Sequence, residues 1–283
     1  MFPEPIQKRS PLAQLIYKFA LPLSLLVWLM PLFAVMLTAL RPAGDINAGN
    51  YWGMPSDILW YENFAEVIFN SEVGPCMLNS IKITVPTMLG AVGIACLTGY
   101  ALAVYRFKLN LAVFFMFIAG NFVPFQILMV PVRDLTLQLG LFNSMWGLVL
   151  FHVAFQAGFC TLFMRNFIKA LPFDLIEAAR IDGAGEWRIF TRIVLPLMRP
   201  AIAALCVLIF TFIWNDFFWA TVLIQSEADM PVTGGLKALN GQWVARWHLV
   251  SAGSIIAALP PVFMFFAMQK HFIAGLTLGA TKG

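Results

Sequence analysis

The chain has 283 residues, of which 60% are hydrophobic and only 11% are charged, and its formal net charge is +4. Soluble domains carry roughly 25% charged residues, so this composition excludes a soluble globule and indicates an all-α polytopic membrane protein. No basic run suggests nucleic-acid binding. The four cysteines show neither a C-x-x-C spacing nor a Cys/His ligand pattern, so we predict no disulfide framework and no metal site.

Six apolar stretches are long enough to cross a membrane, because a helix needs about 20 apolar residues to span the hydrocarbon core. If the N-terminus lies inside the cell, most of the 18 lysines and arginines fall on the inner side. The positive-inside rule then places both termini in the cytoplasm. The six stretches lie near 19–40, 80–104, 111–131, 144–164, 201–224 and 250–269.

This topology divides the chain into four parts. The first apolar stretch is too long for a secretory signal peptide, so we expect an uncleaved anchor. The parts are a cytoplasmic N-terminus at 1–18, a first span with its outer loop at 19–79, a core of five spans at 80–269 and a cytoplasmic tail at 270–283.

The first outer loop contains a short amphipathic pattern. Leu59, Phe64, Val67 and Ile68 recur near helical spacing, with acidic residues between them. We expect a helix at the outer membrane interface. It could cover the helix bundle or dock a partner, and the pattern favours neither role.

The second span carries small residues at intervals of four. They are Ala91, Ala95, Gly99 and Ala103. A face of this kind lets two helix backbones approach closely, so we predict tight packing within the chain or against a partner.

The third and fourth spans contain polar residues at membrane depth. Asn121 and Gln126 lie in the third, and His152 and Gln156 lie one helical turn apart in the fourth. Such groups usually face the bundle interior or a water-filled path. For His152 a hydrogen-bonded interior position is favoured over a ligand or proton role.

Charged residues gather in the loop at 165–199. Asp174 and Glu177 have the spacing of a capping box, so a helix should start there. Gly183 should occupy the position after the helix end, where a positive φ costs least in glycine. A second helix should run from about 186 to 192 and stop at Leu195-Pro196, because the residue before proline avoids the α region.

The same loop resembles the EAA loop of ABC-importer permeases. In that family the loop forms coupling helices that sit in a cleft of the ATP-binding subunit, whereas an ordinary helical hairpin is the alternative. Every fixed position of the motif is matched, by Glu177, Ala178, Ala179, Gly183, Ile193, Leu195 and Pro196.

The resemblance assigns roles within this loop. Ala178 and Ala179 are small enough to enter a cleft, and Gly183 permits the bend between the two helices. The charged residues should contact the rim of the cleft; they are Glu177, Arg180, Asp182, Glu186 and Arg188.

The fifth span contains an aspartate among aromatic residues. In a continuous helix Asp216 would lie about four residues outward of the centre, where a charge must face a cavity or a partner. Aromatic faces beside amide and carboxylate groups suit sugars, although an Asn-Asp pair at a permease interface is an alternative. The substrate-path candidates are Trp214, Asn215, Asp216, Trp219, Asn121 and Gln126.

The second outer loop, near 225–249, contains Pro231, Gly234 and Gly235. Proline and glycine predict an irregular loop here. Trp243 and Trp247 could anchor this loop at the membrane interface or meet a protein partner.

Taken alone, the glycine-rich sequence of the tail at 270–283 predicts a frayed terminus. It resembles, however, the ending common among permeases of carbohydrate importers, the maltose-permease-like family. The aromatic-Asn-acid pattern at 214–217 resembles that family too, although Gly185 stands where relatives often have a serine cap. In that family the tail can reach between the ATPase subunits, and the matching residues here are Gly275, Thr277, Gly279, Lys282 and Gly283.

The resemblance implies a type I ABC-importer permease fold, with six transmembrane helices and a cytoplasmic coupling helix. The chain would be one half of an inner-membrane pore that imports a sugar or polyol by alternating access. Its expected partners are a second permease, favoured to be a different chain, an ATP-binding subunit dimer, a periplasmic substrate-binding protein and membrane lipid. The chain lacks a Walker A motif, so it should not hydrolyse ATP itself; we expect no cofactor on this chain, and ATP and magnesium to act on the partner.

Three alternatives stay open. The nearest is a permease of the same superfamily for glycerol phosphate, amino acids or an ion. An intramembrane enzyme is disfavoured, because the chain has no HExxH or GxSxG motif. A stand-alone channel or receptor would leave the coupling loop without a role.

Overall fold

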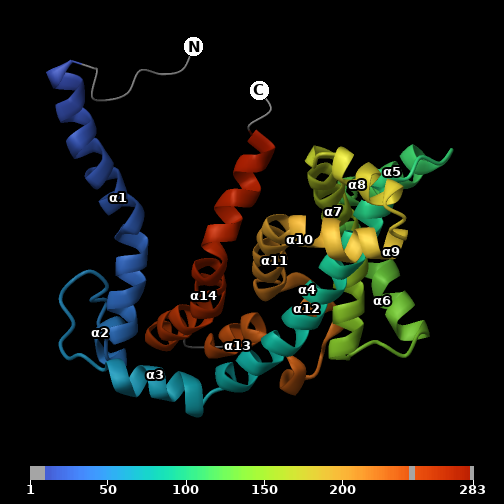
Figure 1. Ribbon diagram of the computed structural model, residues 1–283. Coiled ribbons are helices and arrows are strands. Elements are labelled where there is room, and N and C mark those ends of the chain that lie inside the picture. Colours follow the sequence, from blue (N-terminus) through green and yellow to red (C-terminus); the bar gives the residue numbers. More distant parts are fainter. Residues whose placement is uncertain (1–9, 242–245, 281–283) are drawn as a thin grey trace. The chain divides into compact units, whose positions relative to one another are not determined.

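The computed structural model describes residues 10–241 and 246–280, and side chains as far as Lys270 (Figure 1). The helices fall into two compact units. The first contains the chain up to Ser71 together with Leu239–Ile256. The second contains Glu72–Ala238 together with Ala257–Gly283.

The first unit joins a long apolar helix to a short amphipathic one. The Asn63 side chain, in the amphipathic helix, donates to the carbonyls of Ala39, at 2.8 Å, and Arg41, at 2.9 Å. These bonds hold the amphipathic helix against the C-terminal end of the long apolar one. The short amphipathic helix predicted in this segment is confirmed, with Val67 buried and Trp60 and Tyr61 exposed, and its place at the membrane interface stays a prediction. The helices of this unit are α1 (Pro11–Leu40), α2 (Ala43–Asn47), α3 (Trp60–Phe69) and the beginning of α14 (Trp247–Ala280).

The second unit is built on the pair α4 (Val73–Val104) and α7 (Met145–Ala170), which pack along each other (Figure 1). The small residues predicted to permit close packing do so. Ala91, Ala95 and Gly99 are buried, and a Cβ on Gly99 would lie only 2.8 Å from the Cβ of Met164. Arg165, expected in the charged loop, is instead a buried residue of α7.

The third span is broken, which contradicts the continuous helix expected at 111–131. Its two halves meet at an angle of 92°. Pro124 stands at the break, where its ring and missing N–H prevent helix continuation. The segments are α5 (Asn110–Ala119), η2 (Gly120–Phe122), η3 (Phe125–Leu128) and α6 (Met129–Gln138).

The charged loop folds into an elbow, the name used here for 174–197. Its first helix starts where predicted, at Asp174, but Phe173 is the N-cap and no side chain caps it, so the capping box does not form. The prediction that Leu195-Pro196 ends the second helix was wrong. The chain stays helical through a π turn, which accommodates the missing proline N–H. The elements are α8 (Asp174–Ile181), α9 (Glu186–Ile189), η4 (Phe190–Val194) and α10 (Leu195–Leu197).

The fifth span is also interrupted. α11 (Arg199–Trp214) follows the elbow at a bend of 70°, and α12 (Phe218–Leu223) begins only after a break. Asp216 therefore lies between two helices, not within one as expected. After η5 (Glu227–Asp229), the outer loop forms α13 (Val232–Leu239), so the prediction of an irregular loop was wrong there. Gly234 and Gly235 belong to this helix, and a Cβ on Gly235 would lie 3.0 Å from the Cys76 sulfur.

Within the described residues, four helices are long and apolar enough to cross a membrane, and two bent pairs bring the number to six. The prediction of an all-α polytopic protein with six spans is confirmed in this form. All four cysteines are buried.

Candidate functional site

The bend of the elbow is set by Gly183. Its φ is +76°, a conformation that costs glycine little. The Gly183 N–H donates to Arg180 and the Ala184 N–H donates to Ala179, both at 3.0 Å. This pair of bonds is a Schellman motif, so the predicted glycine stop is confirmed. The following helix, α9, begins with Gly185 as its N-cap.

The α8 helix has one inward and one outward face. Ile176 and Ala179 are buried, whereas Ala178 and Ile181 are exposed. Of the two small residues expected to enter a partner's cleft, only Ala178 is thus accessible. The exposed residues of the elbow also include Glu177, Arg180, Asp182, Trp187 and Arg188.

Glu186 is engaged within the chain instead of standing free at a rim. Arg180 donates to its two carboxylate oxygens, at 2.7 Å and 3.2 Å. The hydroxyls of Tyr100 and Tyr105 donate to the same group, at 3.1 Å and 2.8 Å. We call these four residues the Glu186 cluster. The hydrogen bonds to Glu186 raise the pKa of Arg180 above its ordinary value.

The last three motif residues shape the turn out of the elbow. Ile193 lies in the π turn, and Leu195 and Pro196 form the short helix after it; all three are half-buried. They position the start of α11 and offer little surface to a partner.

A polar cavity of about 340 Å³ lies where the fifth span breaks. Its polar groups come from three spans: Asn121 from the third, His152 and Gln156 from α7, and Asp216 from the break. The remaining lining is mostly aromatic. These residues are Phe125, Phe155, Phe159, Phe212, Ile213 and Trp219.

His152 and Asp216 form the polar centre of this cavity. Their Nε2 and Oδ2 atoms are 3.3 Å apart. Asp216 also accepts from the backbone N–H groups of Trp219 and Ala220, at 3.3 Å and 3.0 Å, and so caps α12. His152 is 3% exposed, and its Nδ1 makes no hydrogen bond within the described chain. A buried unpaired nitrogen is costly, so this atom is poised to bind a polar group.

Three of the substrate-path candidates lie outside the cavity lining. Trp214 is buried, and its indole donates to the Ala257 carbonyl at 2.9 Å. Asn215 is exposed and bonds back to the Thr211 carbonyl at 2.8 Å. Gln126 is exposed on η3. The cavity thus unites Asp216, Trp219 and Asn121 of the predicted set.

The sequence pattern around each residue does not predict that His152 pairs with Asp216. His152 was noted as a polar residue in an apolar span, but its partner is 64 residues away. Only the packing of α7 against the break brings them together.

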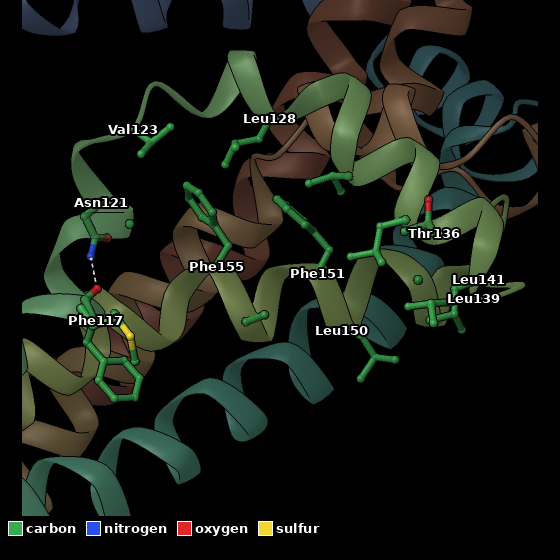
Figure 2. A pocket seen from close by; sticks show the side chains of 17 residues that line it. Phe117, Asn121, Val123, Leu128, Thr136, Leu139, Leu141, Leu150, Phe151 and Phe155 are labelled. Carbon is green, nitrogen blue, oxygen red and sulfur yellow. Dashed lines mark hydrogen bonds between the residues drawn. The ribbon is translucent and has the colours of Figure 1, made fainter. Parts of the chain in front are cut away.

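An apolar cavity of about 640 Å³ adjoins the polar one (Figure 2). Figure 2 shows Phe151 and Phe155 pointing into it from α7, opposite the broken third span. Asn121 and Phe155 line both cavities. The ring of Phe151 lies 4.0 Å from that of Trp219, so aromatic side chains separate the two spaces.

The predicted tail residues reach the limit of the structure. Gly275, Thr277 and Gly279 lie on the helical backbone of α14, whereas Lys282 and Gly283 lie outside the described residues. Among the residues that the structure describes, no three His, Cys, Asp or Glu side chains are grouped as a metal site would require.

Broken spans around a polar cavity, together with a charged helical elbow that leads into α11, are the features of a helical membrane transport subunit. Residues 91–277 match the family described as binding-protein-dependent transport system inner membrane component. The chain belongs to this family of ABC-transporter permeases. It is therefore an inner-membrane translocation subunit and not an enzyme.

Curated relatives match over most of their length. The chain is 35% identical to the osmoprotective compounds uptake permease protein GgtD of Synechocystis sp., over 90% of this chain and 88% of that one. It is 34% identical to the melibiose/raffinose/stachyose import permease protein MelC of Bacillus subtilis, over 90% and 91%.

A solved structure shows the same fold. It is a crystal structure of a bacterial ABC transporter involved in the import of the acidic polysaccharide alginate. The TM-score is 0.80 at 22% identity, and the match covers 93% of this chain and 99% of that one. The expected type I importer permease fold is confirmed.

Proposed function

We propose that this chain is one half of the pore of an ATP-driven importer for a sugar or a sugar-like polyol. The observation that carries the cargo class is the polar cavity. Aromatic side chains surround a small group of hydrogen-bonding residues there, and its volume of about 340 Å³ suits one or two sugar rings. Relatives named for sugar and osmoprotectant uptake support the same class.

The residues that we assign to cargo contact are Asp216, Asn121 and Trp219, joined by His152. The Asp216 carboxylate accepts a hydroxyl hydrogen bond, and the free Nδ1 of His152 either donates to a hydroxyl or accepts from one, depending on its tautomer. The Trp219 ring offers an apolar face to the C–H groups of a sugar. Among the described residues no lysine or arginine lines this cavity, so a neutral cargo fits it better than an anionic one.

The elbow is the proposed dock for an ATP-binding subunit on the cytoplasmic side. The exposed face of α8 presents Ala178 between charged residues, a shape and charge that suit a cleft. ATP and magnesium would act on that partner dimer. A second permease, a periplasmic binding protein and the tail reaching between the ATPase subunits complete the proposed assembly.

The proposal is tested by purifying the chain from its own host's membranes in mild detergent and identifying its partners by mass spectrometry. We expect a second permease, an ATP-binding subunit and a sugar-type binding protein. The binding protein is then titrated with neutral sugars, polyols, uronates and glycerol phosphate. Recovery of the chain without a nucleotide-binding subunit, even after crosslinking, would contradict the importer assignment; tight binding of only the anionic compounds would contradict the cargo class.

A further inference from the structure

The Glu186 cluster joins segments that are far apart in the sequence. Tyr100 lies in the last turn but one of α4 and Tyr105 follows that helix directly, whereas Glu186 begins α9. Both tyrosine hydroxyls converge on one carboxylate oxygen. Their rings pack edge to face with centroids 5.8 Å apart, which holds the two hydroxyls side by side.

The cluster links α4 to both arms of the elbow. Arg180, on α8, reaches the same carboxylate with two parallel bonds, a geometry that fixes orientation as well as distance. The Tyr100 ring also packs against Phe190 of the π turn, with centroids 5.1 Å apart. Glu186 is therefore the point where α4, α8 and α9 meet.

The same end of α4 is tied to two further spans. The Leu102 carbonyl accepts from the Arg165 guanidinium, at 3.3 Å, and from the Asn110 amide, at 3.1 Å. The Arg165 guanidinium carbon lies 3.8 Å from the centroid of the Phe114 ring. Because Arg165 belongs to α7 and Phe114 to α5, a displacement of this end of α4 acts on both.

The covalent connections of α8 are less direct. It is joined to α7 through Leu171, whose extended backbone interrupts the helix, and to α9 through the bend at Gly183. Neither joint is a continuous helix, so α8 is not coaxial with α7 or with α9 along the backbone. The hydrogen bonds of the cluster supply a lateral connection that does not pass through either joint.

We propose that Tyr100 and Tyr105 are positioning residues that make the elbow move together with the C-terminal end of α4. The proposal rests on the proposed function, since it takes the elbow to be the dock of an ATP-binding subunit. Glu186 then works inside the permease, holding the elbow to α4, and is not a contact of the partner. Motion at the dock reaches the polar cavity through α4 and α7.

The test compares Tyr100→Phe/Tyr105→Phe with wild type in the full complex, reconstituted in nanodiscs with its ATP-binding subunit and binding protein. The double variant loses two hydroxyls and keeps the rings and the Arg180–Glu186 pair. We expect normal assembly and basal ATP hydrolysis, with stimulation by loaded binding protein reduced about tenfold, the size expected for losing hydrogen bonds to a charged group. Tyr51→Phe, an exposed loop tyrosine, is the matched control and should behave as wild type.

Glu186→Gln provides a second variant, which keeps an acceptor oxygen but removes the charge. Because the amide nitrogen cannot accept from Arg180 or from the tyrosines, this variant weakens the whole cluster and should lose at least as much stimulation as the double tyrosine variant, with the same basal rate. Full stimulation in the double tyrosine variant would overturn the proposal, and so would a parallel loss of assembly and basal hydrolysis, which would mark a purely structural role. Absence of any ATP-binding subunit from the wild-type complex would instead overturn the proposed function.

Discussion

The elbow and the polar cavity differ in how far the hydrogen-bonding groups of their charged and polar side chains are satisfied. In the elbow the Glu186 carboxylate accepts four hydrogen bonds from Arg180, Tyr100 and Tyr105 among the described residues. In the cavity His152 is buried, and one of its ring nitrogens has no hydrogen-bond partner within the described chain. The neighbouring Asp216 carboxylate faces that ring and also accepts a hydrogen bond from the first turn of α12. A self-satisfied cluster suits the transmission of force, and an incompletely satisfied one suits the binding of a ligand.

The largest effect should come from the elbow bend. Gly183→Val places a β-branched residue at φ +76°, and a strained backbone of this kind costs about 1–3 kcal/mol. Nothing lies within 4 Å of the added Cβ, so the strain is conformational and not a clash. We expect uptake in proteoliposomes to fall by about tenfold or more with the assembled complex still present. Gly183→Asn, which tolerates this conformation, should retain most uptake, and equal uptake in the two variants would exclude the role of the bend.

The next effect tests the cavity. Asp216→Asn keeps an acceptor for the α12 cap but removes the charge facing His152, whereas Asp216→Ala removes both. Both variants should raise the half-saturating cargo concentration for uptake. Only Asp216→Ala should also lower the melting temperature, by the equivalent of about 1 kcal/mol for a lost cap. If neither variant changes the half-saturating concentration, Asp216 serves the fold alone.

The third test, with a smaller effect on uptake, separates packing from both sites. Gly99→Ala would place a Cβ 2.8 Å from the Cβ of Met164 and 3.0 Å from the backbone nitrogen of Arg165. Overpacking of this kind destabilises by about 1–3 kcal/mol, so the melting temperature in detergent should fall. Gly93→Ala is the control on the same helix, because nothing lies within 4 Å of its added Cβ. That variant should melt at or above the wild-type temperature, and a similar fall in both would show that α4 tolerates no change on either face.

The smallest effect on uptake is expected at Trp214. Trp214→Phe removes the indole bond to the Ala257 carbonyl but keeps most of the buried ring. The lost hydrogen bond should cost about 1 kcal/mol of stability, and the cavity left by the smaller ring should add a similar amount, about 1 kcal/mol. The half-saturating cargo concentration should stay the same. An altered cargo preference would indicate that Trp214 does contribute to the substrate path.

The sequence predicts the helices that depend on local pattern. Apolar length locates the spans, small residues at intervals of four locate the face of α4 that packs on α7, and Gly183 locates the elbow bend. Each of these follows from the backbone or from one helix face, so neighbouring residues contain the information.

The breaks and the clusters could not be predicted in the same way. The apolar run from 201 to 224 contains no proline or glycine, and the helix stops at Asn215, where Asp216 caps α12 locally and faces His152 across the fold. Pro124 was a signal for the other break, but prolines also occur within membrane helices, as Pro86 does in α4. Glu186 meets tyrosines more than 80 positions earlier in the chain, a contact that no local spacing reveals.

The close approach of α4 and α7 at Gly99 also fixes their register. One helical turn along α4 in either direction, about 5.4 Å, brings Ala95 or Ala103 to this point. Both carry a methyl group where the spacing to Met164 leaves no room for one. The two helices therefore resist sliding past each other by a turn, and this permease subunit can change shape by tilting the pair together more readily than by shearing it.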